Sequence, residues 1–418
     1  MRASELAAIV RVRAFRRLYA TRLTSQLTDG VFQVALAGYV FFSPERQASA
    51  GQAAAAFAVT LLPYSALGPF AGVLIDRWAR RRILVWAPVV RALLVLSVTV
   101  LVASGDDGAV FFAAVLIVLG VNRFFLAALS ASLPHVVDAP RLVTANAFTV
   151  TSGTIAAFAG AGIGYGLRAV VGGGAEGTAV ILLATAALFL AAGAIATRLP
   201  DLGPDDAPRA AVRDVAHGLA DGVRYLASHR QGAFALAAIG YHRLLYGVVL
   251  MMTLLLCRNH FTGGDADAGM TTFAAMLGFS GAGFFVAALI TPWAVERVGK
   301  RAWITINLAA GAGALALFAT PFTRLPWAVG AFALGVVSQG VKLSVDTILQ
   351  QSITDAYRGR VFALYDMLFN ALFAAGAAAS AALLPPDGVS PLTLAALVTA
   401  YAAGALAYRT ATRPVPVA

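Results

Sequence analysis

Long apolar runs most constrain what this chain can fold into, because they recur along almost its whole length. Twelve such runs are separated by short polar segments. A membrane-spanning helix needs about 20 predominantly apolar residues. The chain is 60% hydrophobic and only 12% charged, which is more apolar than soluble domains are. The predicted spans are 18–42, 53–75, 84–103, 109–131, 146–170, 178–197, 233–257, 271–293, 303–320, 327–349, 362–384 and 391–408.

Lys and Arg are distributed unevenly between the two sets of loops. With the N-terminus placed inside, 22 of them lie in inside segments and 4 in outside loops. Cytoplasmic loops keep an excess of Lys and Arg. We therefore expect a multi-pass protein of the cell membrane, with both termini cytoplasmic. This distribution explains the net charge of +11 without nucleic acid as a partner. A cleaved signal peptide is the alternative for the N-terminus, but Gln26, Asp29 and Gln33 interrupt the apolar region that it would need.

Charged residues between and within the spans repeat at offsets of 217 to 220 residues. The first copies and their repeats are Asp76, Arg77, Arg80 and Arg81 with Glu296, Arg297, Lys300 and Arg301; Asp138 and Arg141 with Asp355 and Arg358; and Arg123 with Lys342. Parallel repeats of this kind build membrane transporters. The pattern predicts an all-α membrane protein, with twelve transmembrane helices in two pseudo-symmetric six-helix bundles at 1–197 and 233–418.

The segment 198–232 is predicted to be a cytoplasmic linker. Five apolar residues in it step by three or four positions, as on one face of an amphipathic helix. They are Val212, Val215, Leu219, Val223 and Leu226.

The stretch "GVLIDRWARRR" at 72–82 resembles the signature loop between helices two and three of the major facilitator superfamily, and the resemblance runs the full length of the chain. The usual pattern has Gly where this chain has Ala79, and the second copy keeps Gly299. The resemblance implies that these loops contact the opposite half as a cytoplasmic gate in one access state. The alternative is that they only fix topology. The gating candidates are Gly72, Asp76, Arg77, Arg80, Arg81, Asp138, Arg141, Glu296, Arg297, Gly299, Lys300, Asp355 and Arg358.

Two further stretches are similar to the bacterial branch of macrolide and siderophore exporters. They are "SASLPHVVDAPRLVTANAF" at 130–148 and "QQSITDAYRGRVFALYDMLFN" at 350–370. Gly153, Gly162 and Gly166 match the glycine spacing of the superfamily's antiporter motif, although Leu167 replaces the proline expected there. The resemblance favours antiport.

Ionisable side chains within the membrane are costly and mark functional sites. Eight fall inside the predicted spans: Arg22, Asp29, Arg91, Arg123, Arg243, Lys342, Asp346 and Asp366. Arg22, Arg91 and Asp366 are expected near the inner surface, where long arginine side chains can snorkel. Lys342 and Asp346 are four residues apart and are expected to pair on one helix face.

Asp29, Arg123 and Arg243 are expected deep in the membrane, on helices that line the central cavity in the superfamily. We interpret Asp29 as the proton carrier, with Arg123 or Arg243 as the cation that controls its charge. The alternative is a fixed ion pair that only holds helices together. Polar residues that are candidates for the cavity wall are Gln33, Asn122, Tyr241, His242, Gln339, Lys342 and Asn370.

No catalytic motif, phosphate-binding loop or metal-ligand spacing occurs in the sequence, so we expect no enzyme activity, cofactor or metal. The favoured function is secondary active transport by alternating access. It would be proton-coupled export of a small amphipathic molecule by a functional monomer in the lipid bilayer. The alternatives are import of a small anionic solute, which the excess of deep cations favours, and a receptor or scaffold without transport.

Overall fold

The protein is seen in a computed structural model that describes residues 8–42, 79–106, 108–138, 141–202 and 212–413. In these ranges all regular structure is helical, and ten helices are long and apolar enough to cross a membrane. The predicted all-α membrane fold is therefore confirmed for the described ranges. Some predictions lie outside the described residues: the span 53–75, Gly72, Asp76 and Arg77, and the side chains of Asp355 and Arg358.

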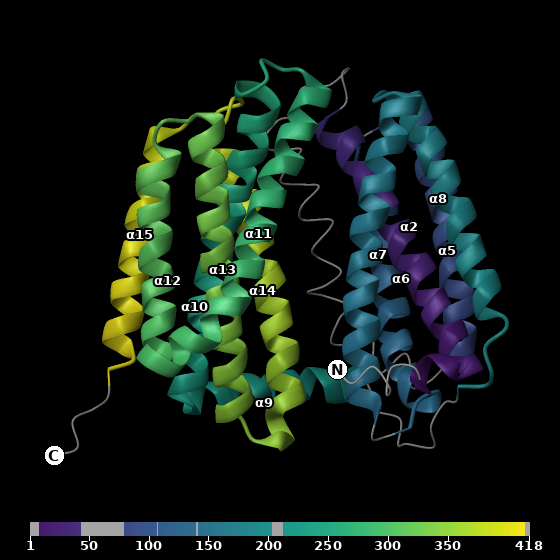
Figure 1. Ribbon diagram of the computed structural model, residues 1–418, viewed down its shortest axis with the longest axis horizontal. Helices are drawn as coiled ribbons and strands as arrows, with labels where there is room; N and C mark the ends of the chain where they lie inside the picture. The colour runs from purple at the N-terminus through teal and green to yellow at the C-terminus, as the bar shows by residue number, and fades with distance from the viewer. Residues whose placement is uncertain (1–7, 43–78, 107, 139–140, 203–211, 414–418) are drawn as a thin grey trace. The chain divides into compact units, whose positions relative to one another are not determined.

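The described residues divide into two compact units, which meet in the sequence at residues 215 and 216. Long helices run side by side in the first unit (Figure 1). They are α2 (Arg13–Phe41), α5 (Arg80–Ala103), α6 (Ala109–Ser132), α7 (Leu142–Val171) and α8 (Ala175–Ala196). Of these, only α2 is absent from the ten apolar helices, because polar residues such as Gln26, Asp29 and Gln33 lower the hydropathy of the part that follows its arginines.

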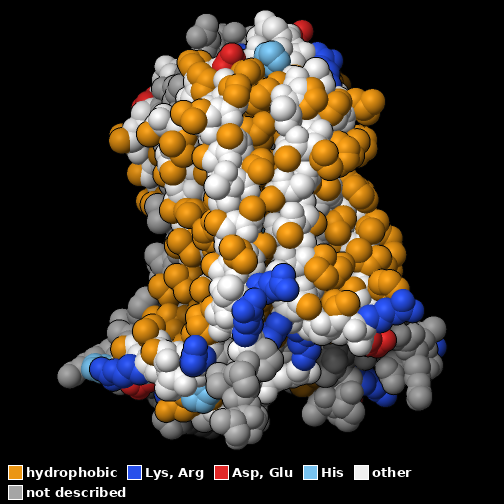
Figure 2. All heavy atoms as spheres, turned by 90° about the vertical axis from the view of Figure 1, so that its left-hand side faces the viewer, with side chains coloured by type: hydrophobic (Ala, Val, Ile, Leu, Met, Phe, Trp, Pro, Cys, Tyr) orange, Lys and Arg blue, Asp and Glu red, His pale blue; other side chains and the backbone are white. Residues whose placement is uncertain are grey.

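The second unit is also a bundle of long helices. They are α10 (Arg230–Leu255), α11 (Ala266–Val298), α12 (Lys300–Ala314), α13 (Arg324–Ser352), α14 (Asp355–Leu383) and α15 (Pro391–Ala411). Single π-helical segments, Leu256–His260 and Leu315–Ala319, continue α10 and α12. Large apolar side chains of this unit such as Trp293, Leu325 and Leu406 are more than half exposed, as a lipid-facing surface requires. Figure 2 shows hydrophobic side chains spread over much of one face of the molecule.

The segment predicted as a linker contains a helix, α9 (Val212–Ser228). Its Tyr225 ring stacks on Tyr357 of α14 at 4.2 Å between ring centroids, and Asp221 lies 3.9 Å from Arg360. Of the predicted apolar stripe, Leu226 is buried but Val223 is exposed. The end of α9 is therefore attached to α14 through aromatic and charged contacts, and the side chains of Val212 and Val215 lie outside the described residues.

Glycines let helices touch backbone to backbone in both units. In the first unit, a Cβ on Gly30 of α2 would lie 2.0 Å from the Ala157 carbonyl oxygen, and one on Gly160 of α7 would lie 1.9 Å from the Leu27 carbonyl oxygen. Small residues of this kind allow close helix packing in membranes.

The same contact recurs in the second unit. A Cβ on Gly247 of α10 would lie 2.3 Å from the Phe373 carbonyl oxygen, and one on Gly376 of α14 would lie 2.0 Å from the Leu244 carbonyl oxygen. The four residues are offset by 216 or 217 positions from their counterparts in the first unit. The two units therefore repeat a packing contact as well as a charge pattern.

The antiporter-motif glycines only partly coincide with this contact. Gly153 packs against the Gln26 and Arg22 side chains of α2, but a Cβ on Gly162 or Gly166 would meet no atom within 4 Å. The face of α7 that approaches α2 is set by Gly153, Gly160 and Gly164, which follow the helical repeat.

The residue before α12 is Gly299, and the equivalent residue before α5 is Ala79. The backbone conformation differs between these two positions. Gly299, between α11 and α12, has φ +81°, which L side chains rarely adopt. Ala79, at the equivalent position before α5, has φ −58° and ψ 118°. The alanine is accommodated because the backbone at position 79 has a negative φ.

We expect Gly299→Ala to destabilise the protein by about 1–3 kcal/mol, because the substitution places a side chain on a positive-φ backbone. The measurement is thermal unfolding of the purified protein in detergent. Gly313→Ala is the matched control, since a Cβ there meets no atom within 4 Å. Equal melting temperatures for the two variants would contradict the backbone argument.

Candidate functional site

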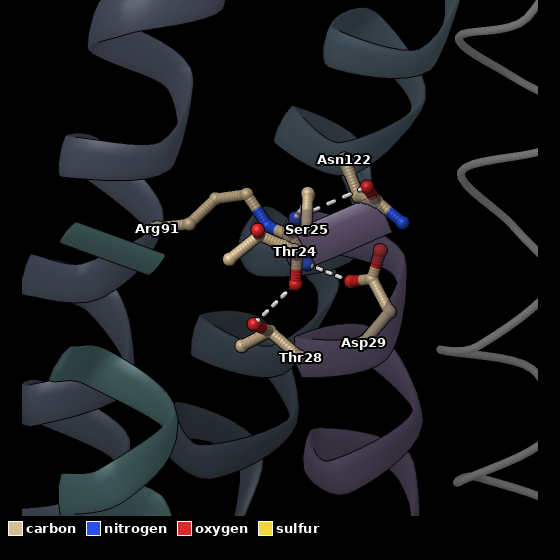
Figure 3. A network of polar contacts seen from close by, with 6 residues as sticks. All are labelled: Thr24, Ser25, Thr28, Asp29, Arg91 and Asn122. Carbon is tan, nitrogen blue, oxygen red and sulfur yellow. Dashed lines mark hydrogen bonds and ion pairs between the residues drawn. The ribbon is translucent and has the colours of Figure 1, made fainter. Parts of the chain in front are cut away.

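A buried ion pair joins two helices in the middle of the first unit. Asp29 lies halfway along α2, and its Oδ1 pairs with Nη2 of Arg91 from α5. Arg91 is fully buried, and Asp29 is 4% exposed. Figure 3 shows the Arg91 side chain reaching across to the carboxylate. Because both groups lie in a membrane-spanning unit away from water, each charge depends on the other for compensation.

Neighbouring polar groups complete the network around Arg91. Its Nη1 donates to Oδ1 of Asn122 on α6 at 3.1 Å and to Oγ of Ser25 on α2 at 3.3 Å (Figure 3). The Phe189 ring of α8 lies 3.9 Å from the Arg91 Cζ, so the guanidinium is also covered by an aromatic face. Arg91 is carried by α5 and is surrounded by side chains from α2, α6 and α8. Four helices of one unit therefore meet at this cation.

Two polar atoms of the pair remain without a hydrogen-bond partner among the described residues. They are Oδ2 of Asp29 and Nε of Arg91. Buried polar atoms are nearly always satisfied, and the exceptions call for an explanation. A carboxylate with one paired and one unpaired oxygen has a position at which it can hold a proton while the other oxygen keeps its contact.

The prediction that Arg91 snorkels to the membrane surface is wrong. Helix α5 begins at Arg80, four residues before the predicted span, which places Arg91 about 17 Å along the helix. Its side chain turns inward, toward α2. The partner of Asp29 in the structure is therefore Arg91. Arg123, one of the two predicted partners, lies half-buried on α6, next to Asn122 in the sequence. Sequence spacing did not reveal the pair, because its members are 62 residues apart.

Arg243 of α10 lies against aromatic rings in the second unit. Its Cζ is 4.0 Å from the ring centroid of Phe369 and 4.0 Å from that of Phe373, both on α14. Its Nε donates to the Phe369 carbonyl oxygen at 3.3 Å. Within the described part of the chain, no carboxylate forms an ion pair with Arg243. The cation is held by ring faces and one carbonyl, which leaves the edge of its guanidinium with donors for an anion.

Tyr241 and His242, predicted as cavity residues, pack against α15 within the second unit. The Tyr241 hydroxyl donates to the Ala400 carbonyl oxygen at 2.7 Å, and His242 Nδ1 lies 3.2 Å from the Tyr401 hydroxyl. His242 is fully buried. These contacts hold α10 to α15.

The remaining polar candidates lie on helices of both units. Lys342 and Asp346 form the predicted ion pair on α13, with Nζ 2.7 Å from Oδ2. Asn370 donates to the Asp366 carbonyl oxygen on its own helix at 2.8 Å. Gln339 is half-buried on α13, and Gln33 is exposed on α2. Asn122 is the predicted cavity residue that contacts Arg91.

The basic residues that begin α5 and α12 make equivalent contacts in the two units. Arg81 donates to the Thr197 carbonyl oxygen after α8 at 2.7 Å, and Arg301 donates to the Thr412 carbonyl oxygen after α15 at 3.3 Å. Arg80 contacts His135 after α6, and Lys300 contacts Gln351 near the end of α13. The repeated charges therefore hold neighbouring helix ends together within each unit.

The other described gating candidates lie at the surface. Glu296 is exposed, and the Arg297 guanidinium lies 4.3 Å from the Trp293 ring centroid. Asp138 and Arg141 form an exposed ion pair at 3.6 Å. Among the residues that the structure describes, no group of three or more His, Cys, Asp or Glu side chains is arranged to hold a metal ion.

Comparisons with known proteins agree with this architecture. The sequence profile of the Major Facilitator Superfamily matches residues 19–378. Uncharacterised MFS-type transporters of Mycobacterium bovis and Mycobacterium tuberculosis are each 38% identical over 397 residues, which cover 93% of this chain and 89% of theirs.

Solved structures share the fold at low sequence identity. The nucleoside transporter NupG matches with a TM-score of 0.68 and 15% identity, covering 96% of this chain and 99% of NupG. A bacterial homologue of the human lysosomal transporter Spinster matches with a TM-score of 0.56 and 13% identity, covering 98% of this chain and 95% of the homologue. The profile match and the relatives at 38% identity show that the chain belongs to the major facilitator superfamily, as a multi-pass membrane transporter.

Proposed function

We propose that this protein is a proton-coupled antiporter that exports a small amphipathic molecule by alternating access. The observation that carries the proposal is the Asp29–Arg91 pair, a carboxylate and its cation buried halfway along two membrane helices. Ionisable groups at such depth in transporters serve as proton relays. The similarity of 130–148 and 350–370 to macrolide and siderophore exporters supports the direction and the kind of substrate.

Coupling would follow from a change in the distance between the two charges. While Arg91 touches the carboxylate, it stabilises the charged form of Asp29 relative to the same carboxylate without its cation. When the helices shift between access states and the guanidinium withdraws, an unpaired carboxylate in the membrane interior favours the neutral acid. Asp29 would then load a proton on one side and release it on the other. The protein needs no cofactor for this cycle and acts as a monomer.

Transport by purified protein in liposomes tests the proposal. A panel of labelled macrolides and siderophores is offered with and without a pH gradient. We expect at least one compound to be expelled against its concentration gradient only when protons flow in the opposite direction. Substrate movement that ignores the pH gradient would reject proton coupling, and no movement of any compound would reject this substrate class.

Import of a small anionic solute is the second candidate, and the position of Arg243 favours it. Two phenylalanine rings lie 4.0 Å from its guanidinium carbon. Such an arrangement suits bidentate recognition of a carboxylate or phosphate.

We expect Arg243→Gln to weaken binding of an anionic substrate about 10–100-fold, because a hydrogen bond to a charged group contributes about 1.5–3 kcal/mol. Arg243→Lys should recover little, since an ammonium lacks the planar pair of donors. Binding is measured by scintillation proximity with labelled substrate. Arg297→Gln is the control, since Arg297 also stacks on an aromatic ring, but at an exposed helix end. Equal losses in both variants would argue against a specific anion site.

We also propose that the protein lies in the cell membrane with both termini in the cytoplasm, as the distribution of Lys and Arg indicates. Single cysteines at Ser104, after α5, and Thr410, in the last turn of α15, should react with an impermeant maleimide from opposite sides of intact cells. Buried Cys257 is replaced by Ala in both proteins to remove background labelling. Labelling of both positions from the same side would reject this topology.

A further inference from the structure

A concave basic pocket of about 600 Å³ lies where the ends of several helices meet in the second unit. Its cations are Lys300 and Arg301 at the start of α12, and Arg409 and Arg413 at and beyond the end of α15. Val298 of α11 and Ile348 of α13 add apolar wall. No Asp or Glu is among the described residues that line it. We call this site the basic pocket.

Two of its four cations have no protein partner in the described part of the chain. Lys300 donates to Gln351, and Arg301 donates to the Thr412 carbonyl oxygen at 3.3 Å. The Arg409 and Arg413 side chains form no hydrogen bond or ion pair with another described residue. Four positive charges around one hollow, without an acid, repel one another. An anion in the pocket would relieve that repulsion.

The first unit shows what fills the equivalent position there. Its counterparts of Lys300 and Arg301 are Arg80 and Arg81, 220 residues earlier. The chain after α8 folds back over this site: the Leu202 carbonyl oxygen accepts from Arg80 at 3.3 Å, and Leu199 and Leu202 are 2% and 0% exposed within an apolar cluster. In the first unit, a carbonyl oxygen and two leucine side chains therefore cover the basic helix start.

The surface beside the basic pocket is apolar. Leu406 lies one turn before Arg409 on α15 and is 63% exposed, and Ile306 lies beside Thr305 of the pocket on α12 and is 45% exposed. Figure 2 shows Lys and Arg side chains gathered low on this face, with hydrophobic side chains covering the surface above them. A ligand with an anionic headgroup and apolar chains fits this site, because the cations of the pocket lie next to exposed apolar side chains.

We propose that the basic pocket binds the headgroup of an anionic phospholipid, whose acyl chains lie along the exposed surface of α12 and α15. The phosphodiester takes the place that the Leu202 carbonyl oxygen occupies in the first unit, and the chains take the place of the leucine side chains. Basic pockets between membrane helices are suited to such headgroups.

The test measures lipid binding to the purified full-length protein by native mass spectrometry. The probes are phosphatidylglycerol, phosphatidylcholine and sn-glycerol 1-phosphate. We expect retention of phosphatidylglycerol and not of phosphatidylcholine or of the free headgroup. The double variant Arg409→Gln/Arg413→Gln should weaken phosphatidylglycerol binding about 30-fold, from about 1 kcal/mol for each arginine.

The matched control removes the same charge from the other unit. Arg82 and Arg198 are exposed at the corresponding helix ends of the first unit, so Arg82→Gln/Arg198→Gln should leave phosphatidylglycerol binding unchanged. Equal losses of phosphatidylglycerol binding in the two double variants would mean that surface charge attracts the lipid in general. That result would overturn the proposal. Retention of sn-glycerol 1-phosphate at the same concentrations would also overturn it, in favour of a site for soluble phosphates.

Discussion

Asp29→Asn is expected to abolish transport driven by a pH gradient while substrate exchange across the liposome membrane continues. Asparagine has nearly the shape of the protonated acid but cannot release a proton. Exchange of labelled for unlabelled substrate needs no net proton movement, so it should survive. The measurement is a comparison of gradient-driven efflux and counterflow in the same liposomes. Efflux against a gradient by the Asp29→Asn protein would place the coupling carboxylate elsewhere, at Asp346 or Asp366.

Unfolding measurements on variants of the pair separate coupling from a structural role. Arg91→Met leaves the Asp29 carboxylate buried without its cation, which is expected to cost about 3–5 kcal/mol. Adding Asp29→Asn to this variant should recover most of that loss, because no charge is then left unpaired. Asp138→Asn is the control for a carboxylate at the surface, since the Asp138 side chain is 82% exposed. A stable double variant that also transports against a gradient would show that the pair is only structural.

Gly160→Val is expected to destabilise the first unit by about 3 kcal/mol or more, at the upper end of the cost of overpacking. Even a Cβ at this position would lie 1.9 Å from the Leu27 carbonyl oxygen, and a backbone cannot move aside as a flexible side chain can. Helices α2 and α7 would have to separate. The measurement is the melting temperature and the monodisperse yield of the purified protein.

Gly162→Val is the matched control. Gly162 lies on the same helix as Gly160, but a Cβ there would meet no atom within 4 Å. Its melting temperature should stay within a few degrees of that of the unchanged protein. Gly376→Val tests the repeat, and its effect should resemble that of Gly160→Val. Equal tolerance of valine at positions 160 and 162 would contradict the backbone contact.

Much of the fold could be predicted because it follows from local patterns. Apolar runs of membrane length gave the spans, which match the described helices to within about seven residues at their ends. Neighbouring residues on one helix also gave the Lys342–Asp346 pair. Contacts across helices were harder. The partner of Asp29 depends on how α2 and α5 rotate and on where α5 begins, and the misplaced start of α5 put Arg91 near the surface.

For other residues the sequence did not show which way the side chain points, because composition carries no direction. Tyr241 and His242 are polar residues on a membrane helix, which suggested a cavity, but their side chains turn to α15. The antiporter spacing pointed to Gly162 and Gly166, whereas the helical repeat from Gly153 leads to Gly160 and Gly164. A check of which glycines share one helix face would have found this contact from the sequence.

The ion pair also sets an order of events during synthesis. Asp29 leaves the ribosome 62 residues before Arg91, which at about 5–20 residues per second is about 3–12 seconds. During that interval, α2 meets the insertion machinery with a carboxyl group whose cation does not yet exist. The first helix therefore enters the bilayer carrying a neutral acid or waits beside the translocon for α5. We therefore expect the rate of translation between these two helices to influence how efficiently the first unit is assembled.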